Sequence, residues 1–438
     1  MVHISATELT EGKMFYSLMK SCSPLIWPSL FWRSVSGKVP ILLPGVVFLL
    51  MILAACKNEK NTETSRILIA GKEIPFSEKE KDRLFIAHRG VHFNHTIAGE
   101  NSLEAVRLAK RAGFELIETD VRWTLDSILI VMHDKTLNRT CLNSDGTEIL
   151  NEVEVADVTL EKLKSDFILK ANEKINNTTV PTLKEFLIEC KNCGIVPFIE
   201  PKLNDVPDKY YRTIISEADE VMGRNNYVIT SNNSANKIIR DMGFKDIILM
   251  GVLYLSTFEE IENLGNVIMA ISATQFQSKE YSDNVIRAKL SGIPTESHAN
   301  TFEKFALIND NGIDIISTDI LAPDLNDKSE LLNLPAKSWY NNFNYNGSMI
   351  NGTIVLSQDE TISLKTELPE IYFGGIFIEI ELSGNCEVIF ANKKFLINNP
   401  EMKVNKHQVM IHSSIPQFSL TAKDKCIIKN IDLKLVTF

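Results

Sequence analysis

The stretch RLFIAHRGVHFNHTIAGENS, residues 83–102, contains the feature that decides the fold. Residues 84–87 are apolar, as in a buried strand, and the run ends at once in His88-Arg89-Gly90. The next segment, SLEAVRLAKRAG (102–113), has an apolar helical face, basic residues in its last turn and a glycine stop. A buried strand that leads through polar residues into an amphipathic helix predicts a β/α unit with functional groups at the end of the strand.

The same alternation of apolar runs and helical patterns continues to about residue 325. Near-continuous apolar strands separated by helices predict parallel strands that are covered on both sides. Eight or so such units in roughly 240 residues predict a (β/α)₈ TIM barrel over residues 83–330. An open doubly wound sheet is the alternative, but no Gly-rich nucleotide fingerprint follows the first strand. The expected strands are 84–90, 116–124, 128–134, 195–202, 227–233, 246–255, 267–276, 292–299 and 313–320, with 128–134 as a hairpin-like continuation of the second.

The C-terminal part of the chain follows a different pattern. In GGIFIEIELSG (374–384), Ile and Leu alternate with Phe, Glu and Ser, and IIKNIDLKLVTF (427–438) alternates in the same manner. Period-two runs separated by Asn and Gly turns predict a small all-β, sandwich-like domain over residues 338–438. Its sequence contains no motif that indicates a role.

The N-terminal 56 residues resemble an export signal rather than domain material. An uncharged run, VPILLPGVVFLLMILAA (39–55), follows basic residues and ends in small residues directly before Cys56. This ending resembles the lipobox of bacterial lipoproteins, in which Cys56 would carry the lipid. We therefore expect a leader over 1–56, a linker over 57–82, and an exported protein anchored to a membrane, at the periplasmic or outer-membrane face. An uncleaved transmembrane anchor is the alternative, although the run is short and contains Pro40 and Pro44.

Charge and cysteine content exclude two classes of protein. The formal net charge is −10 and no segment forms a basic stripe, so nucleic acid is not an expected partner. Of seven cysteines, five lie outside the leader and the lipobox, and this odd number argues against a full disulfide framework. Cys190 and Cys193 are expected to form a local disulfide or to remain two free thiols. Oligomeric state is not predicted.

Polar residues stand where the predicted barrel strands end. Active sites of such barrels are built at the carboxyl ends of the strands, so these side chains are expected to converge on one mouth. Residues two apart in a strand point the same way, which applies to Glu118 with Asp120 and to Glu200 with Lys202. The strand-end residues are His88, Arg89, Glu118, Asp120, His133, Asp134, Glu200 and Lys202.

This set of residue types fits the cleavage of a phosphodiester. Three carboxylates suit a hard cation, Ca²⁺ or Mg²⁺, and they repel one another when buried without a cation. Arg89 and Lys202 suit a phosphate group. His88 and His133 can exchange a proton near neutral pH. Because neighbouring strand residues point to opposite sides, Arg89 can join His88 only if the chain bends at Arg89.

The chain resembles the glycerophosphodiester phosphodiesterase family over residues 84–325. The matching motifs occur in the family's order: HRG (88–90), ENS (100–102), ETDVRWTLDSILIVMHD (118–134), VPTLKEFL (180–187), IEPK (199–202) and GIDIISTD (312–319). The resemblance implies a metal-dependent hydrolase that releases an alcohol and glycerol 3-phosphate. It implies that His88 and His133 are the acid–base pair, that Glu118, Asp120 and Glu200 hold the metal, and that Arg89 and Lys202 bind the phosphate.

The resemblance is weakest in the late strands. GIPTESHAN (292–300) lacks the family's usual Trp-Thr-x-Asn, and STDILAP (317–323) replaces a common TDRP, so the leaving-group alcohol is not predicted. Asp319 matches a family position but receives no role. His92 and His95 are either further pocket residues or structural ones.

Two other functions are considered. A non-catalytic lipoprotein that binds phosphate or a glycan would retain the barrel without turnover. A barrel glycosidase would use two carboxylates such as Glu118 and Glu200. The glycosidase leaves both histidines, Arg89 and Lys202 without a function.

Overall fold

The computed structural model describes residues 68–69, 72–73, 83–171, 178–203, 207–273, 278–323, 328–334 and 338–438. Residues 63–438 form one compact unit that contains both a barrel and a C-terminal sheet. The predicted leader and Cys56 lie outside the described residues, as does most of the predicted linker. Within the described part of the chain, no helix has both the length and the apolar character needed to cross a bilayer.

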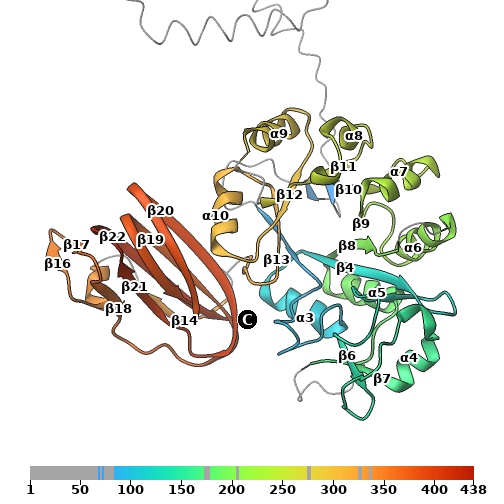
Figure 1. Cartoon of the computed structure of the whole chain (residues 1–438), viewed down its shortest axis with the longest axis horizontal. Coiled ribbons are helices and arrows are strands. Elements are labelled where there is room, and N and C mark those ends of the chain that lie inside the picture. The colour runs from blue at the N-terminus through green and yellow to red at the C-terminus, as the bar shows by residue number, and fades with distance from the viewer. Residues whose placement is uncertain are drawn as a thin grey trace, which may run out of the picture. The chain divides into compact units, whose positions relative to one another are not determined.

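The barrel consists of eight parallel strands among the described residues, each paired with the next, and the pairing of the last with the first closes the ring. The predicted (β/α)₈ barrel is therefore confirmed (Figure 1). Alternate strand residues such as Ile86, Phe198 and Ile268 fill its interior. The strands are β3 (Leu84–Ala87), β4 (Leu116–Trp123), β8 (Val196–Pro201), β9 (Val228–Thr230), β10 (Ile248–Val252), β11 (Val267–Ala270), β12 (Thr295–His298) and β13 (Ile315–Thr318).

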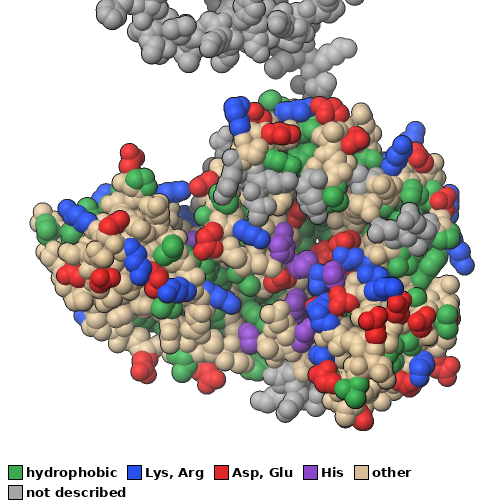
Figure 2. Space-filling model, in the orientation of Figure 1, with side chains coloured by type: hydrophobic (Ala, Val, Ile, Leu, Met, Phe, Trp, Pro, Cys, Tyr) green, Lys and Arg blue, Asp and Glu red, His purple; other side chains and the backbone are tan. Residues whose placement is uncertain are grey.

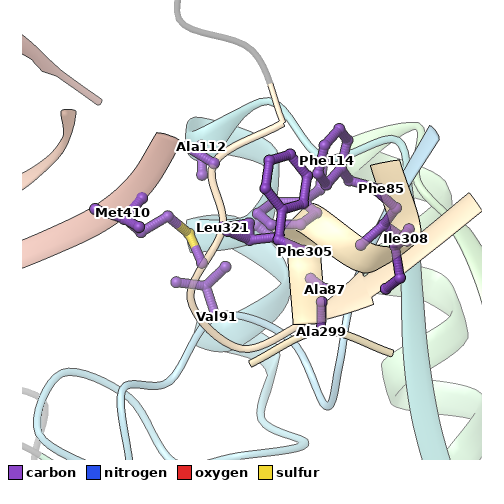
Figure 3. Packing of buried hydrophobic residues seen from close by; sticks show 14 of the residues in the cluster. Phe85, Ala87, Val91, Ala112, Phe114, Ala299, Phe305, Ile308, Leu321 and Met410 are labelled. Carbon is purple, nitrogen blue, oxygen red and sulfur yellow. The ribbon is translucent and has the colours of Figure 1, made fainter. Parts of the chain in front are cut away.

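Helices cover the outside of the barrel. Helix α3 (Leu103–Ala112) begins where the Ser102 hydroxyl accepts from the backbone N–H of Ala105, and it ends at Gly113 with a left-handed φ of 98°. Figure 3 shows Phe85 and Phe114 packed with Phe305 and Ile308 outside the strands. The other helices of the ring are α5 (Leu183–Cys193), α6 (Asp208–Val221), α7 (Asn233–Asp241), α8 (Phe258–Glu262), α9 (Lys279–Leu290) and α10 (Phe302–Asp310).

An insertion separates β4 from α5. The run 128–134, expected as a hairpin-like continuation of the second strand, forms β5 (Leu129–Val131), which pairs antiparallel with β4 and is not one of the eight barrel strands. It leads into a small cluster with its own buried apolar residues. The cluster contains β6 (Cys141–Asn143), α4 (Leu160–Asp166) and β7 (Phe167–Leu169).

The C-terminal residues form one antiparallel sheet of nine strands, within the part of the chain that the structure describes. The predicted alternation holds, since Ile376, Ile378, Ile380 and Leu382 are all fully buried. Strand β14 (Ser329–Leu334) pairs with β22, so this sheet also includes residues that precede the predicted start at 338. The other strands are β15 (Phe343–Tyr345), β16 (Ser348–Ile350), β17 (Thr353–Leu356), β18 (Thr361–Leu364), β19 (Ile371–Phe390), β20 (Lys393–Ser414), β21 (Phe418–Ala422) and β22 (Cys426–Thr437).

Candidate active site

The chain bends sharply where β3 ends. Arg89 has a φ of 56° and Gly90 a φ of 77°, so both lie in the left-handed region. A Cβ at residue 90 would lie 2.7 Å from the Cβ of Ala105, which requires glycine there. The bend brings Arg89 back toward the mouth, where its Nε lies 3.3 Å from an oxygen of Asp120. His88 and Arg89 therefore serve the same site although they are adjacent.

Strand register brings three carboxylates together. Glu118 and Asp120 lie on one face of β4, and Asp120 is the direct partner of Glu200 on β8. One ligand oxygen from each of the three lies within 4.8 Å of the others. Glu118 and Asp120 are buried, with 6% and 0% of their surfaces exposed. The predicted metal-binding triad is thus assembled as a cluster.

The electrostatics of this cluster fit a divalent cation. Glu118 Oε1 is buried and has no hydrogen-bond partner among the described residues. Burial and the neighbouring Asp120 carboxylate raise the pKa of Glu118 well above its usual range. Buried carboxylates that repel one another and retain a free oxygen are a donor set for a hard cation such as Ca²⁺ or Mg²⁺.

Lys202 lies among the same carboxylates. Its Nζ is 2.7 Å from Glu200 Oε1 and 3.0 Å from Asp120 Oδ1. Burial acts to lower the pKa of Lys202, but the charges of Asp120 and Glu200 outweigh it and raise this pKa. Lys202 therefore stays charged beside the triad.

His88 is held by a residue from the last barrel strand. Its Nδ1 lies 2.8 Å from Asp319 Oδ1, and its Nε2 lies 3.8 Å from Glu118 Oε2. Asn300 donates from its side-chain amide to the other oxygen of Asp319. Burial acts to lower the pKa of His88, but Asp319 and Glu118 raise it to about 9. Asp319, a residue without a predicted role, fixes the orientation of the imidazole.

His133, like His88, has a carboxylate partner at Nδ1. Its Nδ1 lies 2.6 Å from Asp134 Oδ1, and Arg139 binds both oxygens of Asp134. Arg139 also forms a two-bond pair with Glu100, at 2.7 and 2.8 Å, and Glu100 contacts Arg89. His133 is not part of the lining of the main cavity, and this network links it to Arg89.

The ENS motif supplies residues whose roles were not predicted. Asn101 donates to Asp120 Oδ2 at 2.8 Å and accepts from the Thr119 hydroxyl at 3.0 Å. Glu100 joins Arg89 to Arg139, and Ser102 caps α3. The motif was visible in the sequence, but its hydrogen bonds depend on how residues 89–102 fold back over the strand ends.

The main cavity, of about 510 Å³, opens at the barrel mouth and extends from the triad to the late strands. Figure 2 shows histidines gathered there among acidic and basic side chains. Its far wall includes Glu296, His298 and Lys304. Burial raises the pKa of Glu296 to about 7, so this carboxyl group is largely neutral below that pH. His298, His88 and Asp319 form a second group whose donor atoms lie close enough to hold a cation.

The two histidines of the loop after β3 lie at the edge of the site. His92 is 6% exposed and its Nε2 lies 3.7 Å from Asp319 Oδ1. His95 Nε2 lies 3.6 Å from Glu100 Oε2. Neither histidine lines the main cavity. Instead, His92 contacts Asp319, which pairs with His88, and His95 contacts Glu100, which pairs with Arg89.

Comparison with known proteins agrees with this geometry. The sequence model of the "Glycerophosphoryl diester phosphodiesterase family" matches residues 88–245. Human "Glycerophosphodiester phosphodiesterase 1" is 36% identical over 129 residues, which cover 28% of this chain and 35% of that protein. "Glycerophosphodiester phosphodiesterase" from Caldanaerobacter subterraneus is 38% identical over 149 residues, covering 30% of this chain and 57% of that protein. The matches thus span about a third to over half of these relatives.

Solved structures with similar barrels carry related names. A glycerophosphodiester phosphodiesterase from Parabacteroides distasonis has a TM-score of 0.45 and 23% identity, over 54% of this chain and 92% of that one. A phosphodiesterase from Oleispira antarctica, in complex with the product sn-glycerol-3-phosphate, has a TM-score of 0.44 and 21% identity, over the same shares. The sequence of residues 88–245, the first part of the barrel, is therefore similar to the glycerophosphoryl diester phosphodiesterase family.

Proposed function

We propose that the protein hydrolyses glycerophosphodiesters to an alcohol and glycerol 3-phosphate, with a divalent cation and two histidines. One observation carries this proposal: Glu118, Asp120 and Glu200 meet at the barrel mouth beside His88, Arg89 and Lys202. Buried carboxylates that share a site with two cations and an imidazole are suited to an anionic substrate that arrives with a metal ion.

The three carboxylates would hold the cation, which would polarise the phosphoryl oxygens and lower the pKa of the attacking hydroxyl. Arg89 and Lys202 would grip the phosphate through charge-assisted hydrogen bonds. Their own carboxylate partners position them, since Arg89 contacts Asp120 and Glu100, and Lys202 contacts Glu200. Ca²⁺ and Mg²⁺ both suit this donor set.

The two histidines would move the protons. In each, a carboxylate engages Nδ1, from Asp319 for His88 and from Asp134 for His133, which leaves Nε2 available to the substrate. An imidazole held in one orientation by a carboxylate is the arrangement that general acid–base catalysis needs. One histidine would take the proton from the attacking oxygen, of water or of a glycerol hydroxyl, while the other protonates the oxygen of the leaving alcohol. Where the glycerol hydroxyl attacks, water then opens the cyclic phosphate to glycerol 3-phosphate.

The test follows release of glycerol 3-phosphate from a set of glycerophosphodiesters by the purified protein. We expect turnover, and we expect His88→Ala and His133→Ala each to lower kcat by at least about 10²-fold. His407→Ala is the matched control, because His407 is buried in the C-terminal sheet. Full turnover in both barrel variants would refute the roles of these histidines. Binding without turnover of any phosphodiester would favour a non-catalytic binding protein.

We also propose that the protein is exported and anchored to a membrane through a lipid on Cys56. The support is the sequence LAAC at residues 53–56 after an uncharged apolar run. Mass spectrometry of the N-terminal peptide should find a lipid-modified cysteine at residue 56. An unprocessed N-terminus in membrane-extracted protein would refute this anchor.

A further inference from the structure

Strand β20 of the C-terminal sheet lies against the segment that follows Asp319. The backbone N–H of Met410 donates to Ile320 O at 2.7 Å, and Leu321 pairs with Val409. Figure 3 shows Met410 reaching from this strand toward Leu321 and Val91, beyond the end of the barrel strands. The sheet is thus fixed to the barrel directly beside the carboxylate that holds His88.

The same strand also supports the loop after His88. Phe93, Asn94 and His95 have φ values of 50°, 52° and 67°, a left-handed run that is costly for residues other than glycine. The ring of Phe93 packs on His412, with 4.3 Å between centroids, and on Phe373. His412 Nε2 also lies 3.2 Å from the Thr96 hydroxyl. Contacts from the C-terminal sheet therefore stabilise an unfavourable loop conformation next to the active site.

A second cavity, of about 270 Å³, lies between these parts. Asp319, Phe93 and Ile320 line it from the barrel, and Asn392, Lys393 and His412 line it from the sheet. Asp319 connects this cavity to the active site, because its Oδ1 contacts His88, which lines the main cavity. The His88–Asp319 pair therefore joins the lining of the main cavity to the lining of this smaller one.

The lining is suited to an uncharged, hydroxyl-rich group. The amides of Asn94 and Asn392 offer donors and acceptors, and His412 Nδ1 is buried without a hydrogen-bond partner among the described residues. A cationic group would meet the ammonium of Lys393, for which the described residues form no ion pair within 4 Å. Asp319, a carboxylate in the same lining, is already paired with His88 through one oxygen and accepts from Asn300 through the other.

We propose that this cavity binds the leaving-group alcohol, and that it takes an uncharged polyol such as a second glycerol in preference to a choline or ethanolamine cation. The proposal rests on the proposed function and adds the substrate class. It also gives the C-terminal sheet a role, since the sheet forms one wall of the subsite. A quaternary ammonium is normally recognised by several aromatic faces, and Phe93 is the one Phe, Tyr or Trp in the lining that the structure describes.

The experiment compares kcat/KM for glycerophosphoglycerol and glycerophosphocholine in three purified proteins. The wild type should favour glycerophosphoglycerol. Lys393→Glu should shift the ratio toward glycerophosphocholine by roughly tenfold, because the charge beside the leaving group is reversed. Lys394→Glu is the matched control, since Lys394 is the next residue of the same hairpin, pairs with Glu387 and does not line the cavity. Its ratio should equal that of the wild type.

Each other outcome has a separate meaning. Hydrolysis of both substrates with the same ratio in Lys393→Glu and the wild type would overturn the subsite but leave the proposed function intact. An equal shift in both lysine variants would also overturn it, because the effect would then be a general surface charge effect. Hydrolysis of neither substrate by the wild type would overturn the subsite together with the proposed function.

Discussion

The two sides of the barrel mouth are built from different chemistry. The side formed by β3, β4 and β8 carries Glu118, Asp120, Glu200, Arg89 and Lys202, in contacts of 2.7–3.3 Å between opposite charges. The side formed by β9 to β13 carries hydroxyls, His298, and the carboxyl group of Glu296, whose pKa burial raises to about 7. His88 stands between them, since it contacts Glu118 on one side and Asp319 on the other.

This difference separates chemistry from selectivity. Buried like charges are stable only with a compensating cation, so the first side is suited to the metal and the phosphate of the proposed function. The second side contains few charges, and its shape and hydrogen bonds face the organic part of a substrate. Substitutions on the first side should therefore affect turnover most, and those on the second should affect positioning or stability.

The largest effect is expected from removal of the cation. Chelation with EDTA should lower the release of glycerol 3-phosphate by at least about 10³-fold, because the charged side would lose its compensating charge and its Lewis acid. Addition of excess Mg²⁺ or Ca²⁺ should restore activity. Full activity in a chelated sample, with metal content verified by elemental analysis, would contradict the assignment of the charged side.

The next effect is expected at Asp319, the positioning residue from β13. Asp319→Asn should lower kcat by roughly 10²-fold, because His88 Nδ1 would lose the carboxylate that orients it. The pH profile should change too, since loss of the carboxylate lowers the pKa of His88 from about 9 toward its usual value. A reduced kcat with an unchanged profile would indicate a purely structural role.

A smaller effect on turnover is expected at Asn101, which donates to Asp120 Oδ2. Asn101→Ala should weaken metal affinity by about 10- to 100-fold in calorimetric titrations, and saturating metal should recover most activity. Asn300→Ala is the matched control on the other side of the mouth, because Asn300 donates to Asp319 and not to the triad. Equal losses of metal affinity in both variants would contradict the division between the two sides.

The smallest effect on turnover is expected at Glu296, where stability should change instead. Its folded pKa of about 7 exceeds its usual 4.5, so the group stabilises the fold below pH 4.5 and this contribution is lost as the pH rises to 7. Relative to Glu296→Gln, the wild type should lose up to about 3 kcal/mol of unfolding free energy between pH 4.5 and 7.5. Urea unfolding at both pH values measures this. Parallel pH dependence in the two proteins would show that Glu296 is ionised in the folded state.

The sequence predicted the charged side well because its geometry is local or regular. Period-two spacing puts Glu118 and Asp120 on one face, and the parallel barrel register sets Asp120 beside Glu200. The sequence also predicted that Arg89 could join His88 only if the chain bends at Arg89, and the left-handed φ of 56° at Arg89 is this bend. The alternation of residues 376–382 likewise predicted the buried face of the C-terminal sheet.

The remaining features depend on contacts that no spacing encodes. Asp319 reaches His88 across 231 positions, and its partner Asn300 lies in the segment that departs most from the family pattern. The docking of β20 beside Asp319 depends on tertiary packing. Lipidation of Cys56 stays a prediction, because that residue lies outside the described part of the chain.

The most direct test of the central claim is the position of a bound metal. Crystals of the protein soaked in Mn²⁺ would give an anomalous diffraction signal from the ion. We expect a peak within about 2.5 Å of oxygens from Glu118, Asp120 and Glu200. A peak at His88, His298 and Asp319 instead, or no ordered metal at the mouth, would contradict the claim that the charged side is the catalytic metal site.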